Sequence, residues 1–186
     1  MNFNYHPELE GRHAFLSASK SHWVNYDEEK LDRTFLNALA AQKGTAQHNY
    51  AAMAIKLGMK QPRTNKTICK YVNDAIGFKM TPEQVLFYSL NAFGTADAIS
   101  FRDNVLRIHD LKTGSSTTMF RQLEVYAAFF CLEYMVKPHE IEIIMAIYQN
   151  DDVKEAIANP VDVANIMERI VIFDERINTI KKEVLL

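Results

Sequence analysis

The chain has 186 residues, of which 48% are hydrophobic and 24% charged, and its formal net charge is −2. This length suits one domain with a sizeable core, and the charge argues against a protein that is basic throughout. No apolar run reaches the ~18–20 residues needed to span a bilayer, and the polar, acid-containing N-terminus does not resemble a signal or transit peptide. A cytoplasmic protein with no membrane partner is therefore expected.

The first part of the chain, residues 15–78, is expected to be helical throughout. Serines at its start suit a helix N-cap, and acids follow in the first turn of a segment whose apolar residues recur at helical spacing. Gly58 and Gly77 each follow such a segment and suit a helix stop. The helical segments are LSASKSHWVNY, DEEKLDRTFLNALAAQ, GTAQHNYAAMAIKLG and RTNKTICKYVNDAIG.

A change in residue pattern after TPEQ predicts a sheet within residues 82–158. VLFYSLNAF, TADAISF and VLRIHDL are short, aromatic or β-branched and separated by turn residues, which predicts a three-stranded antiparallel meander with a tight loop at Asp103–Asn104. SSTTMFRQLEVYAAFFCLEYMV then has helical spacing. HEIEIIMAIYQN alternates as a strand, with Ile141, Ile143, Met145 and Ile147 on one face. DVKEAIA predicts one more short strand.

The last element is a helix over 160–183, with Pro160 early in its first turn. Helices, three strands, a helix, further strands and a final helix then follow one another along the chain. This order predicts a single mixed α+β domain over residues 1–186, with one central mixed sheet flanked by helices and a helical region before it.

Two of the expected strands carry an aspartate, where charge is unusual unless it is paired, bound to metal or catalytic. If these strands pair through the turn at 102–104, Asp97 and Asp110 converge and would repel each other unless they share a proton or a cation. Hard oxygen ligands suit Mg²⁺ or Mn²⁺. Lys112 projects from the same strand face as Asp110, where its ammonium could orient water or stabilise charge.

Four short motifs occur in order, and together they resemble a known family. Their pattern of G-x-x-x-H helix, G-x-x-D strand, D-x-K strand and Q-x-x-x-Y helix is similar to the RecB-type branch of the PD-(D/E)XK nucleases, over about residues 17–135. The early LSASK segment also resembles the L-S-x-S entry of that family. The resemblance implies a restriction-endonuclease-like core. The motif residues are Gly44 with His48, Gly94 with Asp97, Asp110 with Lys112, and Gln122 with Tyr126.

The resemblance implies a role for each motif. Lys112 would position the attacking water, with Asp97 and Asp110 completing the catalytic set. Gln122 and Tyr126 lie one helical turn apart and would brace the lysine or contact the DNA backbone. A neutral imidazole can join carboxylates on such a metal. The implied metal ligands are His48, Asp97, Asp110 and the backbone carbonyl of Leu111.

The implied activity is that of a divalent-metal-dependent DNA nuclease, in particular an exonuclease, that uses Mg²⁺ or Mn²⁺ in DNA recombination, repair or degradation. Its partner would be linear DNA, single- or double-stranded, together with a recombination or single-strand-binding protein. Some members hold an iron–sulfur cluster with four cysteines, whereas Cys69 and Cys131 are the two cysteines here, so no cluster is expected. The sequence also has no helicase P-loop, which favours a stand-alone domain of the kind that phages and mobile elements carry.

Residues 41–80 hold seven lysines and arginines but a single acid, Asp74. A local basic face can hold phosphates even on an acidic protein, and a solvated helix surface is the alternative. The residues expected to bind DNA are Lys43, Lys56, Lys60, Arg63, Lys66 and Lys70.

Two alternatives to the enzyme stay open. A catalytically silent protein with the nuclease fold could act as a nucleic-acid-binding or protein-interaction module. A purely structural protein could use Asp97, Asp110 and Lys112 as an ion-pair network, since D-x-K alone is a weak pattern. The full set of motif residues favours the enzyme over both.

Overall fold

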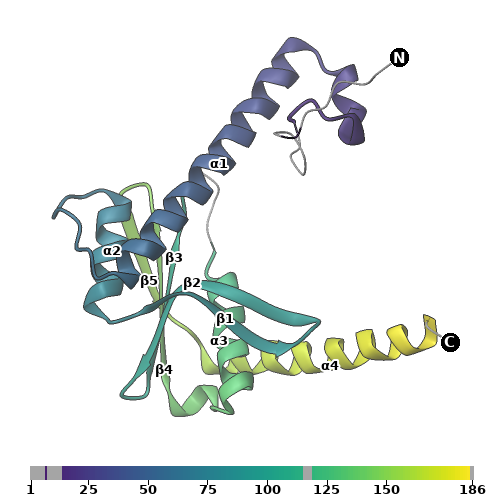
Figure 1. The fold of residues 1–186 in the computed structure, drawn as a ribbon. Helices are drawn as coiled ribbons and strands as arrows, with labels where there is room; N and C mark the ends of the chain where they lie inside the picture. Colours follow the sequence, from purple (N-terminus) through teal and green to yellow (C-terminus); the bar gives the residue numbers. More distant parts are fainter. Residues whose placement is uncertain (1–6, 8–13, 115–118, 185–186) are drawn as a thin grey trace. The chain divides into compact units, whose positions relative to one another are not determined.

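The computed structural model describes Pro7, residues 14–114 and residues 119–184 (Figure 1). The chain divides into two compact units, Met1–Lys43 and Gly44–Leu186, and the boundary falls within a long helix. The assignment of the whole chain to one domain stays a prediction. Within the described residues, no helix combines the length and the apolar character that crossing a membrane requires.

The first unit holds a 3₁₀ segment, η2 (Ala18–Asn25), and the first part of helix α1 (Glu28–Lys56). Asp27 starts α1, because its Oδ1 accepts a hydrogen bond from the Lys30 amide at 2.8 Å. The helix continues without a break through Gly44, so two of the expected helical segments form one helix. A single glycine weakens a helix by only about 1 kcal/mol and does not end it. The expectation that residues 15–78 are helical throughout is wrong over residues 57–66, which form turns and irregular chain.

The second unit is built on one five-stranded sheet with the strand order β1-β2-β3-β4-β5 (Figure 1). Neighbouring strands are antiparallel except β3 and β4, which are parallel, so the sheet is mixed and the expected α+β class is confirmed. The strands are β1 (Thr81–Ser89), β2 (Ala92–Arg102), β3 (Val105–Leu111), β4 (Glu142–Gln149) and β5 (Asp152–Ile157).

The connections follow from turn chemistry and strand direction. The predicted three-stranded antiparallel meander forms, but the expected first strand VLFYSLNAF is wrong in its bounds, because the β1–β2 turn falls at residues 90–91 within it and β1 begins earlier, at Thr81. The β2–β3 turn uses Asp103 and Asn104 at φ of 50° and 60°, as a two-residue hairpin turn requires. The parallel β3–β4 pair needs a crossover, which α3 (Arg121–Tyr134) and the short η3 (Pro138–Glu140) supply. The last helix, α4 (Pro160–Val184), confirms the predicted terminal helix.

Two hydrophobic clusters cover the sheet. The first joins α3 and the start of α4 to the sheet, and β4 contributes Ile143, Met145 and Ile147 to it. The second joins α2 (Thr67–Gly77) and the end of α1 to the sheet, and β4 contributes Ala146 and Tyr148 to it. The predicted alternation of β4 is therefore confirmed, since side chains two residues apart share a cluster.

The N-terminus of helix α2 is capped by a residue from a turn that is distant in sequence. Its N-cap residue Lys66 makes no side-chain cap, and the β4–β5 turn supplies one instead. Asp151 Oδ1 accepts hydrogen bonds from the Thr67 amide at 2.7 Å and the Thr67 hydroxyl at 3.1 Å, and these bonds lower the pKa of Asp151. The turn and the helix N-terminus therefore form one rigid edge of the second unit.

A buried histidine of β3, His109, lies close to the other end of α2. Tyr148 donates its hydroxyl hydrogen to Asp74 Oδ2 at 2.9 Å. Since that hydrogen is used, His109 Nδ1, 3.2 Å from the same hydroxyl oxygen, donates to it. Phe78 packs edge-on against the imidazole, and burial, helped by Arg107, lowers the pKa of His109 to about 4. His109 is therefore neutral at physiological pH.

This histidine predicts an acid-sensitive fold. The unfolded chain takes up a proton at the ordinary histidine pKa of about 6.5, whereas the folded chain resists protonation down to about 4. The contribution of His109 to stability therefore falls as the pH drops through that window, by about 3 kcal/mol in total. Urea unfolding at several pH values should show this loss, and His109→Phe should lose less. Equal losses in the two proteins would contradict the assignment.

Candidate metal centre

The two strand aspartates face each other on neighbouring strands. Asp97 of β2 and Asp110 of β3 lie one position beyond the paired residues Ala98 and His109. The Leu111 amide donates a hydrogen bond to Asp97 Oδ2 at 2.9 Å, which fixes that carboxylate against the end of β3. The structure therefore brings the two aspartates together on neighbouring strands, as predicted. The role of the Leu111 carbonyl as a metal ligand stays a prediction.

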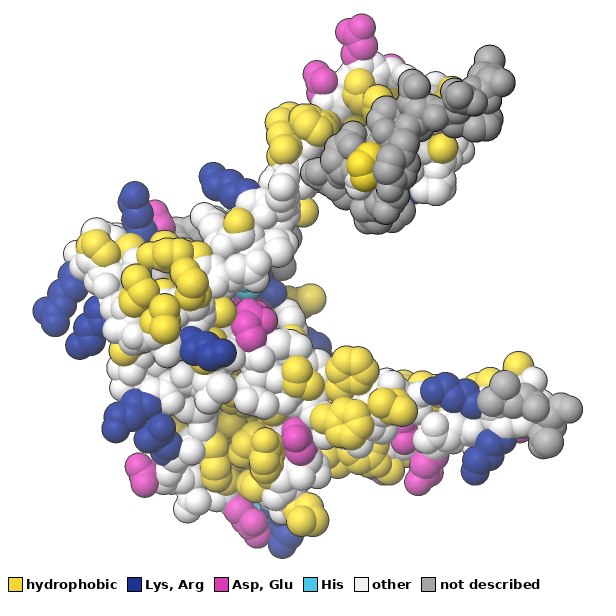
Figure 2. Space-filling model, viewed as in Figure 1, with side chains coloured by type: hydrophobic (Ala, Val, Ile, Leu, Met, Phe, Trp, Pro, Cys, Tyr) yellow, Lys and Arg dark blue, Asp and Glu magenta, His cyan; other side chains and the backbone are white. Residues whose placement is uncertain are grey.

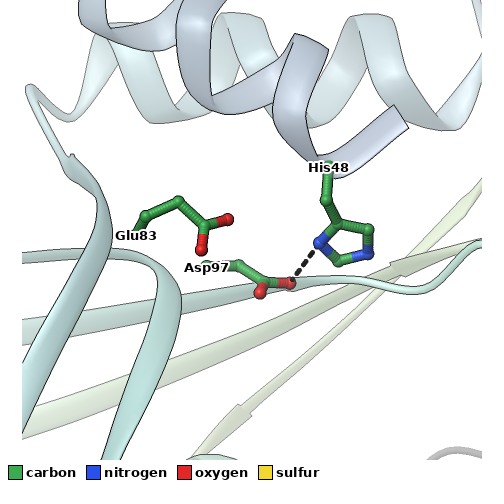
Figure 3. Close-up of side chains that lie close together, drawn as sticks. All are labelled: His48, Glu83 and Asp97. Carbon is green, nitrogen blue, oxygen red and sulfur yellow. Dashed lines mark ion pairs between the residues drawn. The ribbon is translucent and has the colours of Figure 1, made fainter. Parts of the chain in front are cut away.

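The helix histidine reaches the same place. His48 Nδ1, from α1, lies 3.5 Å from Asp97 Oδ2, and this hydrogen-bonded carboxylate raises the pKa of His48 (Figure 3). A third side chain, Glu83 of β1, points at the pair. One ligand atom from each of His48, Glu83 and Asp97 lies within 4.8 Å of the other two. An imidazole and two carboxylates at this spacing form a donor set for a divalent cation.

Glu83 is the functional candidate that sequence reasoning missed. It is the third residue of β1 and has φ 50°, a left-handed conformation that costs a non-glycine residue about 1–3 kcal/mol. Burial and the nearby Asp97 raise the pKa of Glu83, and His48 opposes them. The residue follows Pro82 in a stretch that predicts a turn, and no motif spacing marks it. The feature that identifies Glu83 is its left-handed backbone conformation, which directs the carboxylate toward His48 and Asp97.

Asp110 belongs to a neighbouring, more buried part of the centre. Its side chain is only 3% exposed, and its Oδ1 lies 3.0 Å from Lys112 Nζ. Its Oδ2 is buried and has no hydrogen-bond partner among the described residues. Burial and Asp97 raise the pKa of Asp110, and Lys112 opposes them. A buried carboxylate oxygen without a partner is costly in a folded protein, and a cation beside Asp97 would relieve that cost.

A chain of hydrogen bonds holds the lysine. Lys112 Nζ donates to Gln122 Oε1 at 2.8 Å, and Gln122 Nε2 donates to the Tyr126 hydroxyl at 3.0 Å. Gln122 and Tyr126 lie one turn apart on α3, as their spacing predicts. Of the two roles that the resemblance implies for them, bracing the lysine is the one for which this geometry supplies contacts.

The glycines of two motifs allow close packing around these residues. A Cβ atom on Gly44 of α1 would lie 2.6 Å from the hydroxyl oxygen of Thr113, directly after Lys112. A Cβ atom on Gly94 of β2 would lie 2.9 Å from the Tyr126 ring. Glycine therefore lets α1 approach the end of β3 and lets the Tyr126 ring lie over β2.

Four of the six basic residues expected to bind DNA line two hollows. Lys60, Arg63 and Lys70 line a hollow of about 520 Å³ beside α2. Lys66 lines a second hollow of about 320 Å³ that also includes Lys112 of the centre. Lys70 Nζ donates to the Asp151 carbonyl at 2.8 Å, so part of its charge already has a partner. Two further residues line neither hollow: Lys56, which ends α1, and Lys43, which ends the first unit.

Replacing Glu83 with glutamine tests whether this carboxylate binds a cation. Glu83→Gln keeps the size of the side chain and removes its charge, so we expect Mn²⁺ affinity to fall by about 10–100-fold. Isothermal titration calorimetry with the metal alone measures the effect. Glu168→Gln, on the exposed surface of α4, is the matched control and should bind Mn²⁺ as the wild type does. Unchanged affinity in Glu83→Gln would remove Glu83 from the centre.

Comparison of the chain with protein-family models, with curated proteins and with solved structures finds no match in any of the three.

Proposed function

We propose that this protein is a divalent-metal-dependent DNA nuclease, specifically an exonuclease. The observation that carries the proposal is the unpartnered, buried Oδ2 of Asp110 beside Asp97, in a centre where Lys112 is held by its own hydrogen bonds. A structural ion-pair network would pair its buried oxygens, because an unpaired acceptor costs about 1–3 kcal/mol. The open oxygen supports a site built for a cation.

The donor set suits Mg²⁺ or Mn²⁺. Asp97, Asp110 and Glu83 offer carboxylate oxygens, and His48 offers an imidazole nitrogen, which Mn²⁺ accepts more readily than Mg²⁺. When bound, such an ion polarises a phosphoryl oxygen and lowers the pKa of a bound water. The neutral form of His48 is the ligand, so the carboxylates that raise its pKa also make metal binding weaken as the pH falls.

The residues of the chain would then act on a phosphodiester bond. Lys112, held between Asp110 and Gln122, carries a fixed positive charge that would orient the attacking water and stabilise negative charge developing on the phosphate. Tyr126 would fix Gln122, and through it the direction of the ammonium. Catalysis would depend on this bracing, because misplacing a catalytic group by about 1 Å can cost about 10²-fold in rate.

The DNA backbone would lie along the two basic hollows. Lys66 shares its hollow with Lys112, so a phosphate held there would lie next to the lysine of the centre. Contacts to phosphate carry no sequence information, so the protein would act on DNA of any sequence. A cytoplasmic location and a recombination or single-strand-binding partner are part of this proposal.

The test is degradation of end-labelled linear DNA and of covalently closed circular DNA, each with Mg²⁺, with Mn²⁺ and with chelator. An exonuclease should release label from linear DNA with metal and leave the closed circle intact. Cleavage of the circle would instead indicate an endonuclease. Binding of DNA without hydrolysis of any linear, nicked or single-stranded substrate would reject the enzyme and favour the catalytically silent module.

The basic hollow should make DNA binding depend on salt in a predictable way. Replacing Lys60 and Arg63 together with glutamine should flatten the slope of log affinity against log salt by about 0.9 for each phosphate that the protein no longer neutralises. Fluorescence anisotropy with labelled DNA and Ca²⁺ in place of Mg²⁺ measures the slope without hydrolysis. Lys154→Gln, an exposed lysine on β5, should leave the slope unchanged. Equal slopes in all three proteins would place the DNA elsewhere.

A further inference from the structure

Only the first part of helix α4 packs against the first hydrophobic cluster, and the helix extends beyond it. Val163 is fully buried in the first hydrophobic cluster, and Ile166, Met167 and Ile170 pack against that cluster. The helix continues past α3 toward the C-terminal end of the chain (Figure 1). Its later apolar residues are exposed: Phe173 by 56%, Ile177 by 38%, Ile180 by 42% and Val184 by 78%.

The apolar residues of α4 recur in steps of three and four from one end of the helix to the other. This spacing is the heptad repeat of a coiled coil, whose a and d positions form a seam against a second helix. In the first half the fold itself covers the seam. In the second half the same pattern continues with no covering element among the described residues. The a positions are Val163, Ile170, Ile177 and Val184, and the d positions are Ile166, Phe173 and Ile180.

The charged residues beside the exposed seam would pair with opposite charges on a second copy of α4 if the two helices were antiparallel. In an antiparallel pair, e positions meet e positions and g positions meet g positions. With Ile177 opposite Ile180 of a second copy, Asp174 lies near Lys181 of that copy, and Arg176 lies near its Glu183. In a parallel pair, g meets e, and Arg176 would face Lys181 of the other copy, which is repulsive. The pattern therefore favours two antiparallel copies.

The β1–β2 turn flanks the seam without covering it. Ser89 donates to Asp174 Oδ1 at 2.5 Å, Asn91 donates to the same oxygen at 2.8 Å, and Asn91 also accepts from Lys181. These bonds fix the turn beside the e positions and leave the g positions open, where Arg176 and Glu183 make only a loose 4.0 Å pair. Leu90 in this turn is 85% exposed, and hydrophobic side chains gather over the hairpin tip and along α4 (Figure 2).

We propose that α4 binds a second copy of this chain, antiparallel, over Phe173–Val184. The contact is isologous: Ile177 packs on Ile180 of the other copy, and Phe173 packs on its Val184, twice about a two-fold axis. Leu90 and the hairpin tip border the same contact and extend its apolar area. The inference stands on α4 and the hairpin alone and does not depend on the metal centre or on nuclease activity.

Sedimentation velocity of the full chain over a range of concentrations tests the dimer. Wild type should form dimers, and Ile177→Glu should raise the dimer dissociation constant by about tenfold or more, because the charge enters a central layer twice. Ile172→Glu, which changes an isoleucine that is also exposed (52%) but lies off the seam, is the matched control and should dimerise as wild type does. Far-ultraviolet circular dichroism checks that each variant is folded.

Charge exchange tests the orientation. Arg176→Glu should weaken the antiparallel dimer by facing Glu183 of the other copy, and the double variant R176E/E183R should restore it. Lys182→Glu, at an outward position, should change nothing. The proposal is overturned by a wild-type monomer at every concentration, by a dimer that Ile177→Glu leaves intact, or by an Arg176→Glu dimer tighter than wild type, which would indicate parallel helices.

Discussion

Replacing Lys112 with alanine is expected to reduce metal-dependent DNA hydrolysis by about 10²–10⁴-fold, the range by which a positioned proton-transfer or charge-stabilising group contributes to catalysis. The physical reason is the geometry around its ammonium, which lies 3.0 Å from Asp110 and 2.8 Å from Gln122. Alanine leaves the ligand side chains in place, so Mn²⁺ binding by calorimetry should persist. DNA affinity measured by anisotropy should fall only slightly.

The matched control is Lys154→Ala, which removes an exposed lysine from β5 and should hydrolyse DNA at the wild-type rate. Lys112→Arg should not restore activity, because a planar guanidinium cannot reproduce the point charge of an ammonium between these two partners. If Lys112→Ala hydrolyses DNA within about tenfold of the wild-type rate, Lys112 does not act in the reaction. A variant that lacks both Lys112 and Asp110, purified in the same way, measures hydrolysis by any contaminating nuclease, and this background is subtracted first.

Replacing Asp110 with asparagine is expected to stabilise the metal-free protein and to abolish its response to metal. The Asp110 carboxylate is buried, one of its oxygens has no partner among the described residues, and burial and Asp97 raise its pKa. A raised carboxyl pKa means that the folded state favours the protonated form, so ionised Asp110 lowers stability at pH values above that pKa. Asparagine removes this charge, and the free energy of unfolding should rise by about 1 kcal/mol.

Metal should affect the two proteins differently. A cation that binds only the folded wild type at about 100 times its dissociation constant raises the free energy of unfolding by about 2.7 kcal/mol. Urea unfolding with and without Mn²⁺ should show this gain in wild type and in the exposed control Asp152→Asn, but not in Asp110→Asn. A full metal response in Asp110→Asn would show that Asp110 is not a ligand, even if it remains necessary for hydrolysis.

Local patterns predict the strands and their order along the chain, but not the parallel pairing of β3 with β4. The Asp103–Asn104 turn, the alternation of β4 and the terminal helix each follow from residues close together in sequence, and the structure confirms all three. The sequence does not predict that α1 continues through Gly44. The glycine is needed there because a side chain would clash with Thr113, which is far away in the sequence. Element type is local information, whereas the reason for an exception is usually a distant contact.

The candidate site shows the same division. Periodicity and motif order could bring Asp97, Asp110 and Lys112 together. The hydrogen bond between Gln122 and Tyr126 matches their spacing on α3, and Gln122 in turn accepts from Lys112. Glu83 could not be found this way. Its position depends on a left-handed residue inside a strand, and a sequence that offers proline and glutamate there gives no sign of that conformation. Strain at a site is visible only once the backbone is known.

The strained backbone at Glu83 and the open charge of Asp110 have a consequence for how such a sequence changes over time. A glycine at the first position and an asparagine at the second would each relieve a cost that the metal-free fold bears. A lineage released from the need for catalysis would therefore drift toward both substitutions, because each makes the chain more stable. This chain has glutamate and aspartate at these two positions, so the metal-free fold bears both costs, and the proposed cation would offset the cost at Asp110.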